Sequence, residues 1–223
     1  MFTKLLTVAI MLFGSVSALA QHGVGNGGVG LECPDSDTPN EVIVLDALYG
    51  ELAWGVRIDL GPPGLSWIEK VKLAIRRIPD EDLPRRRNYM KALENFVTRS
   101  VYVSARRLNQ TPDFRMHTPR LPDLIEGRGC RPVQLANLIY EAGRDDFTCF
   151  INKDAFIELT NDQRALLFLH EIVYREWKRA GEDHLEPVYR VVSLLASGDL
   201  EQMPAEKYRE ILSEAGFLVL WQR

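Results

Sequence analysis

Apolar residues spaced three and four positions apart predict the first well-defined helix of the chain. The spacing runs through Ile68, Val71, Ile75 and Ile78. Ser66 and Glu69 at the start of this pattern make a capping box, in which each side chain can satisfy a backbone N–H of the first turn. Residues 66–78 are therefore expected to form an amphipathic helix.

The same periodicity predicts further helices over residues 81–98, 160–180, 186–197 and 204–215. The stretch 160–180 is the most strongly marked, because Thr160 and Gln163 make a second capping box and Gly181 follows its last turn. Gly216 is expected to end the last helix in the same way.

Shorter apolar runs predict β-structure. Residues 101–103 are expected to form a strand, and residues 134–140 and 147–151 flank a Gly-Arg-Asp-Asp turn, which is typical of a β-hairpin. Residues 41–54 begin with β-branched residues, so a short strand or helix start running into a helical turn is expected there. Residues 109–132 contain four prolines and are expected to be loop. The predicted fold class is α+β: a mostly helical single domain with a β-hairpin preceding a long central helix.

The N-terminal residues have the organisation of a secretory signal peptide. Lys4 precedes an apolar run over residues 5–13, and Ala18 and Ala20 supply the small residues of a cleavage site. Cleavage after Ala20 would leave a periplasmic or secreted protein. The apolar run is shorter than the roughly 20 residues that span a bilayer, and no later run reaches that length. No transmembrane segment is therefore expected in the mature chain.

Composition divides the rest of the chain into a leader and one domain. Residues 21–40 are rich in glycine and have few large apolar residues, so they are expected to form a flexible leader. The chain has 46% apolar and 26% charged residues, the composition of an ordinary globular protein. The expected organisation is a signal peptide over 1–20, the leader over 21–40 and a single α+β domain over 41–223.

Three cysteines, Cys33, Cys130 and Cys149, allow three pairings, and one pair is expected to form a disulfide in an oxidising compartment. Cys149 lies in an apolar, strand-like run that suits a buried thiol. Cys33 and Cys130 lie in stretches with glycine and proline, whose backbone can adjust to disulfide geometry. We therefore favour a Cys33–Cys130 disulfide over a metal site, for which C-x-x-C spacing is absent from the sequence.

Positive charge is concentrated in the middle of the chain. The net charge is −4, yet residues 70–131 carry 15 Lys and Arg against 7 acidic residues. The candidate anion-binding residues are Arg85, Arg86, Arg87, Arg106 and Arg107. Such a run is more often a solvated face. As an alternative, it could bind an anionic envelope component, such as lipopolysaccharide or phospholipid headgroups, or nucleic acid.

The helix predicted over 160–180 contains the pattern that raises a question of chemistry. At about 100° per residue, His170 lies in the middle of the apolar arc and Tyr174 about 40° away from it. Glu171 lies about 100° away, on the same side as Arg164 and Arg175. His170 is therefore expected to be buried or to line an inner cleft, and Glu171 is expected to face solvent.

A histidine followed by a glutamate is half of the H-E-x-x-H zinc motif, in which two histidines bind the metal and the glutamate activates a bound water. Tyr174 takes the place of the second histidine, and a phenol with a pKa of about 10 is a poor zinc ligand at neutral pH. A zinc-dependent hydrolase with this altered site would use Glu171 as general base. Its candidate metal ligands are His170, His184 and Glu176, or Glu186 in place of Glu176. Zinc is expected only under this alternative, and no other cofactor is expected.

Two interpretations need no metal. In the first, which we favour, His170 is a core residue that donates to a buried carbonyl or a nearby acid, and Glu171 and Arg175 form a surface pair. In the second, His170 and Tyr174 line a ligand pocket.

The run Leu166–Arg175 resembles a family of uncharacterised exported proteins of Gram-negative bacteria, including predatory ones. Members also share a Gly-rich mature N-terminus followed by a cysteine, here Gly23–Gly28 and Cys33. They share a Gly-Cys-x-x-x-Gln-x-Ala segment, here residues 129–136. The resemblance covers the leader and roughly residues 129–195.

This resemblance implies that Cys33 pairs with Cys130 and that His170, Glu171 and Tyr174 act as a unit, but it implies no activity. A degenerate zincin ancestry is an analogy based on a hairpin followed by a His-Glu helix. The favoured function is a non-catalytic envelope or secreted factor. The alternatives are a zinc-dependent, metallopeptidase-like hydrolase and an anion-binding module that uses residues 70–131.

Overall fold

A computed structural model describes residues 24–26, 28–33, 42–108, 130–140, 147–179 and 184–218. The predicted signal peptide, the hairpin turn and residues 109–129 of the predicted proline-containing loop lie outside the described residues.

Most helices of the described part follow the predicted periodicity, but two short ones, over residues 105–108 and 153–158, were not predicted. The helices are α1 (Leu45–Trp54), α2 (Trp67–Arg76), α3 (Leu83–Arg99), α4 (Ala105–Leu108), α6 (Lys153–Glu158), α7 (Asn161–Arg179), α8 (Glu186–Ala196) and α9 (Ala205–Glu214), with short 3₁₀ helices η1 (Asp80–Asp82) and η2 (Gly198–Gln202).

The strands form two small sheets. They are β1 (Val24–Asn26), β2 (Val29–Glu32), β3 (Val42–Val44), β4 (Val101–Val103), β5 (Arg131–Gln134), β6 (Ala136–Tyr140) and β7 (Phe147–Asn152). One sheet has the order β1-β6-β7-β4 and the other has the order β3-β2-β5. β6 and β7 pair antiparallel, which confirms the predicted hairpin, and β4 pairs with β7 in parallel. The predicted bounds are wrong at one end, because Gln134 belongs to β5 in the other sheet and residues 131 and 132, which were predicted to be loop, lie in that strand.

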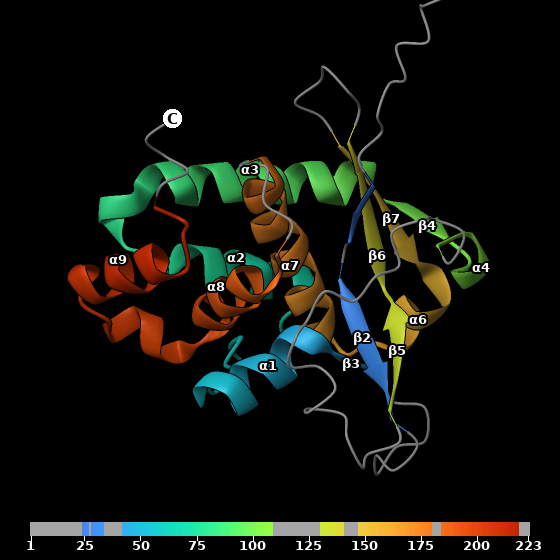
Figure 1. Ribbon diagram of the computed structural model, residues 1–223, viewed down its shortest axis with the longest axis horizontal. Helices are drawn as coiled ribbons and strands as arrows, with labels where there is room; N and C mark the ends of the chain where they lie inside the picture. Colours follow the sequence, from blue (N-terminus) through green and yellow to red (C-terminus); the bar gives the residue numbers. More distant parts are fainter. Residues whose placement is uncertain are drawn as a thin grey trace, which may run out of the picture.

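The long helix α7 lies at the centre of the molecule. In Figure 1 the strands stand to the right, α8 and α9 lie to the left, and α7 runs through the middle. It packs against α1, α2, α3, α8 and β3. Most of the described structure is helical, and the predicted class, a mostly helical α+β domain with a hairpin before a long central helix, is confirmed.

Several predicted helix-end features are confirmed, whereas Gly181, which was predicted to follow the helix α7, lies outside the described residues. Ser66 and Glu69 make the capping box of α2 in both directions. Thr160 Oγ1 accepts a hydrogen bond from the backbone N–H of Gln163 at the start of α7, at 3.2 Å. Gly216, with φ of 78°, follows α9 in the left-handed conformation that only glycine adopts freely.

The expectation of a flexible leader is wrong for its described residues. β1 pairs with β6, and β2 is the central strand of the three-stranded sheet. The reason is that two of its glycines allow close packing rather than freedom. A Cβ built on Gly28 would lie 2.2 Å from Leu167 Cδ1, and one on Gly30 would lie 2.7 Å from Val42 Cγ1.

A disulfide joins Cys33, directly after β2, to Cys130, directly before β5. This is the predicted pairing, and it closes the end of the β2–β5 pair. Cys149 in β7 is buried and is not part of a disulfide, which was also predicted. Among the described residues, no helix is both long enough and apolar enough to cross a membrane.

Candidate functional site

The chemistry-bearing part of α7 is enclosed on every side. Every residue from Ala165 to Trp177 is buried. The prediction that Glu171 faces solvent is therefore wrong, because Glu171 is only 1% exposed, and so is the prediction of a Glu171–Arg175 surface pair. A helical wheel assigns one apolar arc to the core, whereas α7 is covered by helices and strands on several sides.

His170 is fully buried, as predicted, and binds a carboxylate that the sequence analysis did not single out. Its Nδ1 lies 2.9 Å from Oδ1 and 3.1 Å from Oδ2 of Asp46, a buried residue in the first turn of α1. Its Nε2 is buried and has no hydrogen-bond partner among the described residues. Asp46 thus fixes the orientation of the ring through Nδ1, while Nε2 remains buried without a hydrogen-bond partner among the described residues.

Glu171 joins this pair from the next position along α7. Its Oε1 accepts a hydrogen bond from the backbone N–H of Gly28, and its Oε2 is buried with no partner among the described residues. Glu171 therefore ties the N-terminal strands to the central helix. We call Asp46, His170 and Glu171 the His170 cluster.

Burial and neighbouring charges together shift the pKa values of the cluster. It raises the pKa of Glu171 from 4.5 to about 7, although His170 and the Gly28 N–H act in the opposite direction. For His170, burial by itself lowers the pKa, but the charge of Asp46 and its hydrogen bond outweigh this effect and the net shift is upward. Both groups therefore hold a proton more readily in the folded protein than in the unfolded chain.

Tyrosine rings surround the imidazole. The ring of Tyr174 lies 5.9 Å and that of Tyr189 lies 5.4 Å from the ring of His170, measured between centroids. Tyr49 from α1 stacks on Tyr189 at 4.9 Å. The predicted pair of His170 and Tyr174 is thus brought together, within a packed interior.

The other candidate metal ligands are not brought to His170. Glu176 accepts hydrogen bonds from Arg85 at 3.0 Å, in a separate buried ion pair. His184 precedes α8, its side chain is 55% exposed, and its Nε2 lies 3.8 Å from Glu186. Within the described ranges, no group of three or more His, Cys, Asp or Glu side chains is arranged to hold a metal ion.

The predicted anion-binding arginines divide into two sets. Arg85 is 1% exposed and bound to Asp82 and Glu176, so its assignment to a surface patch is wrong. Arg86 is partly buried and donates to the carbonyl of Ile78, two residues after the end of α2. The remaining three, which are exposed, are Arg87, Arg106 and Arg107.

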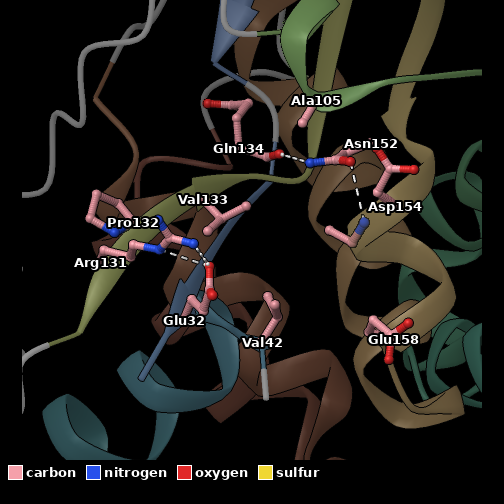
Figure 2. Close-up of a pocket in the computed structure, with 11 residues that line it drawn as sticks. Glu32, Val42, Ala105, Arg131, Pro132, Val133, Gln134, Asn152, Asp154 and Glu158 are labelled. Atoms are coloured by element: carbon pink, nitrogen blue, oxygen red, sulfur yellow. Dashed lines mark hydrogen bonds and ion pairs between the residues drawn. The ribbon is translucent and has the colours of Figure 1, made fainter. Parts of the chain in front are cut away.

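A groove of about 610 Å³, which the sequence analysis missed, lies between β5 and α6 (Figure 2). Its polar walls carry Glu32 and Arg131 on the sheet and Asp154 and Glu158 on α6. Glu32, Arg131 and the Asp154–Glu158 pair are far apart in the sequence, so they give no spacing signal before the strands are paired.

Comparison with known proteins adds no assignment. No protein-family model matches the chain, and searches of the curated proteins and of the solved structures give no match.

Proposed function

We propose that the protein is an exported, non-catalytic envelope or secreted factor whose interior is organised around the His170 cluster. The observation that carries this proposal is the enclosure of the cluster, whose three side chains are at most 1% exposed. A catalytic group has to meet its substrate. A carboxylate and an imidazole that bind each other inside packed helices instead hold those helices together.

Export is supported by the Cys33–Cys130 disulfide, because such bonds persist in oxidising compartments. Mass spectrometry of the protein recovered from the periplasm and the medium is expected to give an N-terminus at Gln21. An intact Met1 on protein that stays in the cytosol would contradict export.

One observation favours the zinc-dependent hydrolase as a second candidate. Asp46 holds Nδ1 of His170, which is how carboxylates orient zinc-binding histidines, and Nε2 has no partner among the described residues. A metal bound at Nε2 would need further ligands, and Tyr174 stands one turn away on α7.

Metal analysis of protein purified without chelator separates the two candidates. A non-catalytic factor is expected to carry no stoichiometric zinc. Near-stoichiometric zinc that is lost in His170→Ala would overturn the proposal in favour of the hydrolase. Tyr174→His, with Tyr174→Phe as its control, restores the missing imidazole. Zinc bound by Tyr174→His alone would indicate a zincin geometry that has lost its metal.

A further inference from the structure

The groove between β5 and α6 shares no residue with the His170 cluster and has the size of a ligand site. Its volume of about 610 Å³ lies within the roughly 300–1,000 Å³ typical of ligand pockets. Its apolar lining consists of Val42, Ala105, Pro132, Val133 and Ala155. β5 pairs with β2, and the carbonyl of Gln134 in β5 accepts a hydrogen bond from Asn152, the residue that caps α6, so the two walls of the groove are connected (Figure 2).

The sheet side of the groove is electrically neutral. Arg131 and Glu32 are directly opposite each other on β5 and β2. Arg131 Nε and Nη2 lie 2.9 Å and 2.7 Å from the same oxygen of Glu32. This cross-strand pair compensates the charge of Glu32, so the net charge of the groove comes from its helical wall.

The helical wall carries two carboxylates that nothing in the described structure neutralises. Asp154 and Glu158 are exposed, one turn apart on α6, and neither side chain forms an ion pair or hydrogen bond with a described residue. Like charges at i and i+4 repel each other. Glu158 is also the last residue of α6, at the negative end of the helix. Asp154 lies in the first turn of α6, where the helix dipole favours an acid, so only Glu158 and its repulsion from Asp154 are not explained by the stability of α6. A cation between the two carboxylates would stabilise both.

We propose that this groove binds an extended peptide segment that carries lysine or arginine side chains. Three carboxylates and one guanidinium line it, which leaves two negative charges for a cationic partner. Lysine and arginine combine an apolar stem with a charged head. The stem lies on Val133 and Ala155, and the head lies between Asp154 and Glu158.

The partner binds through its side chains rather than by extending the sheet. β5 is an edge strand of its sheet, but Pro132 in its middle has no N–H to donate. The carbonyl of Gln134 accepts a hydrogen bond from Asn152 Nδ2 at 3.1 Å. Both features obstruct the ladder that an added strand would need.

The test is calorimetric titration of the purified protein with the peptide acetyl-Ala-Lys-Val-Lys-Ala-amide. Asp154→Asn combined with Glu158→Gln is expected to weaken binding about tenfold, the effect of losing two partly screened charge contacts. The matched control is Glu51→Gln combined with Glu94→Gln, which removes two exposed carboxylates outside the groove and is expected to leave the affinity unchanged. Circular dichroism checks that both double variants are folded.

Several outcomes would overturn the proposal. Equal affinity of the two double variants would place the peptide elsewhere, and binding of an analogue with glutamate in place of lysine would exclude charge recognition. Failure of the peptide to bind at millimolar concentration while spermidine binds would show a site for small polyamines. A crystal structure in which other residues of the same chain fill the groove would show that it is not a docking site. None of these outcomes bears on the enclosure of the His170 cluster, so a failure of peptide binding in the groove would not contradict the proposed function.

Discussion

At the scale of single residues, the His170 cluster is a buried polar connection between three elements. His170 joins α7 to α1 through Asp46, and Glu171 joins α7 to the backbone just before β2. Both links are buried, and in the protein interior the loss of one hydrogen-bond partner costs more free energy than a formed hydrogen bond contributes to stability. We therefore expect replacement of these residues, although they resemble a reaction centre, to lower the stability of the folded protein.

Replacing His170 with alanine removes a buried ring and leaves the Asp46 carboxylate without its donor. We expect the free energy of unfolding to fall by roughly 2–4 kcal/mol, from the cavity and the unsatisfied acid together. Urea denaturation of the variant measures this loss. Glu94→Ala, at an exposed position of α3, is the control and should change stability by less than about 0.5 kcal/mol. Equal stability of the two variants would contradict a structural role for His170.

Glu171 gives a pH dependence with a definite sign. Burial raises its pKa from 4.5 to about 7, so between these values the folded protein holds a proton that the unfolded chain releases. The stability that this raised pKa contributes is fully present below pH 4.5 and is lost as the pH rises through about 7. The raised pKa of His170 acts in the same direction.

We therefore expect the free energy of unfolding to increase, by up to about 3 kcal/mol, on going from about pH 8 to about pH 5. Denaturation at a series of pH values measures the slope. Glu171→Gln removes this titration, so its slope over the same range should be smaller. Parallel curves for the two proteins would show that Glu171 does not carry the effect.

At the scale of elements, the leader shows how glycine can serve packing. Gly28 lies against Leu167 and Glu171 of α7, and no side chain fits between the leader and the helix at this point. The hydrogen bond from Gly28 to Glu171 needs the same close approach. The pairing of β1 and β2 with their sheets therefore depends on a glycine, although the glycine-rich composition of the leader had suggested disorder.

Gly28→Ala is expected to destabilise the protein by roughly 1–3 kcal/mol, because the new methyl group would overlap Leu167. Thermal unfolding followed by circular dichroism measures the change. Gly64→Ala is the matched control, since a Cβ at Gly64 has nothing within 4 Å. If both variants melt at the same temperature, the leader does not pack on α7 as described.

At the scale of the whole molecule, the disulfide ties the start of the domain to its middle. Cys33 and Cys130 are 97 residues apart in the sequence. In the chain-entropy model, a cross-link of this length stabilises by up to about 4–5 kcal/mol. We expect Cys33→Ser combined with Cys130→Ser to lose a large part of this stability in urea denaturation. Peptide mapping without reductant should link the two cysteines and leave Cys149 reactive only after unfolding, whereas a Cys130–Cys149 link would contradict the structure.

Local patterns in the sequence determined much of the architecture. The capping box at Ser66, the cap at Thr160, the glycine after α9 and the apolar runs of the hairpin act within a few residues of one another, so their effect does not depend on the rest of the chain. Burial of His170 followed from the apolar arc of its helix. The disulfide pairing followed from the contrast between an apolar strand and two loops.

Only the tertiary structure decided what surrounds these elements. Asp46 lies 124 positions before His170 and Gly28 lies 143 positions before Glu171, and no spacing rule connects residues so far apart. The burial of Glu171 and Arg85 came from neighbours on a second side of their helices, which a pattern read along one helix does not contain. Asp154 and Glu158 likewise became the wall of a groove only when α6 packed beside β7 and β5 paired with β2. Periodicity fixes which residues form an element, whereas the packing of several elements together fixes the environment of each charge.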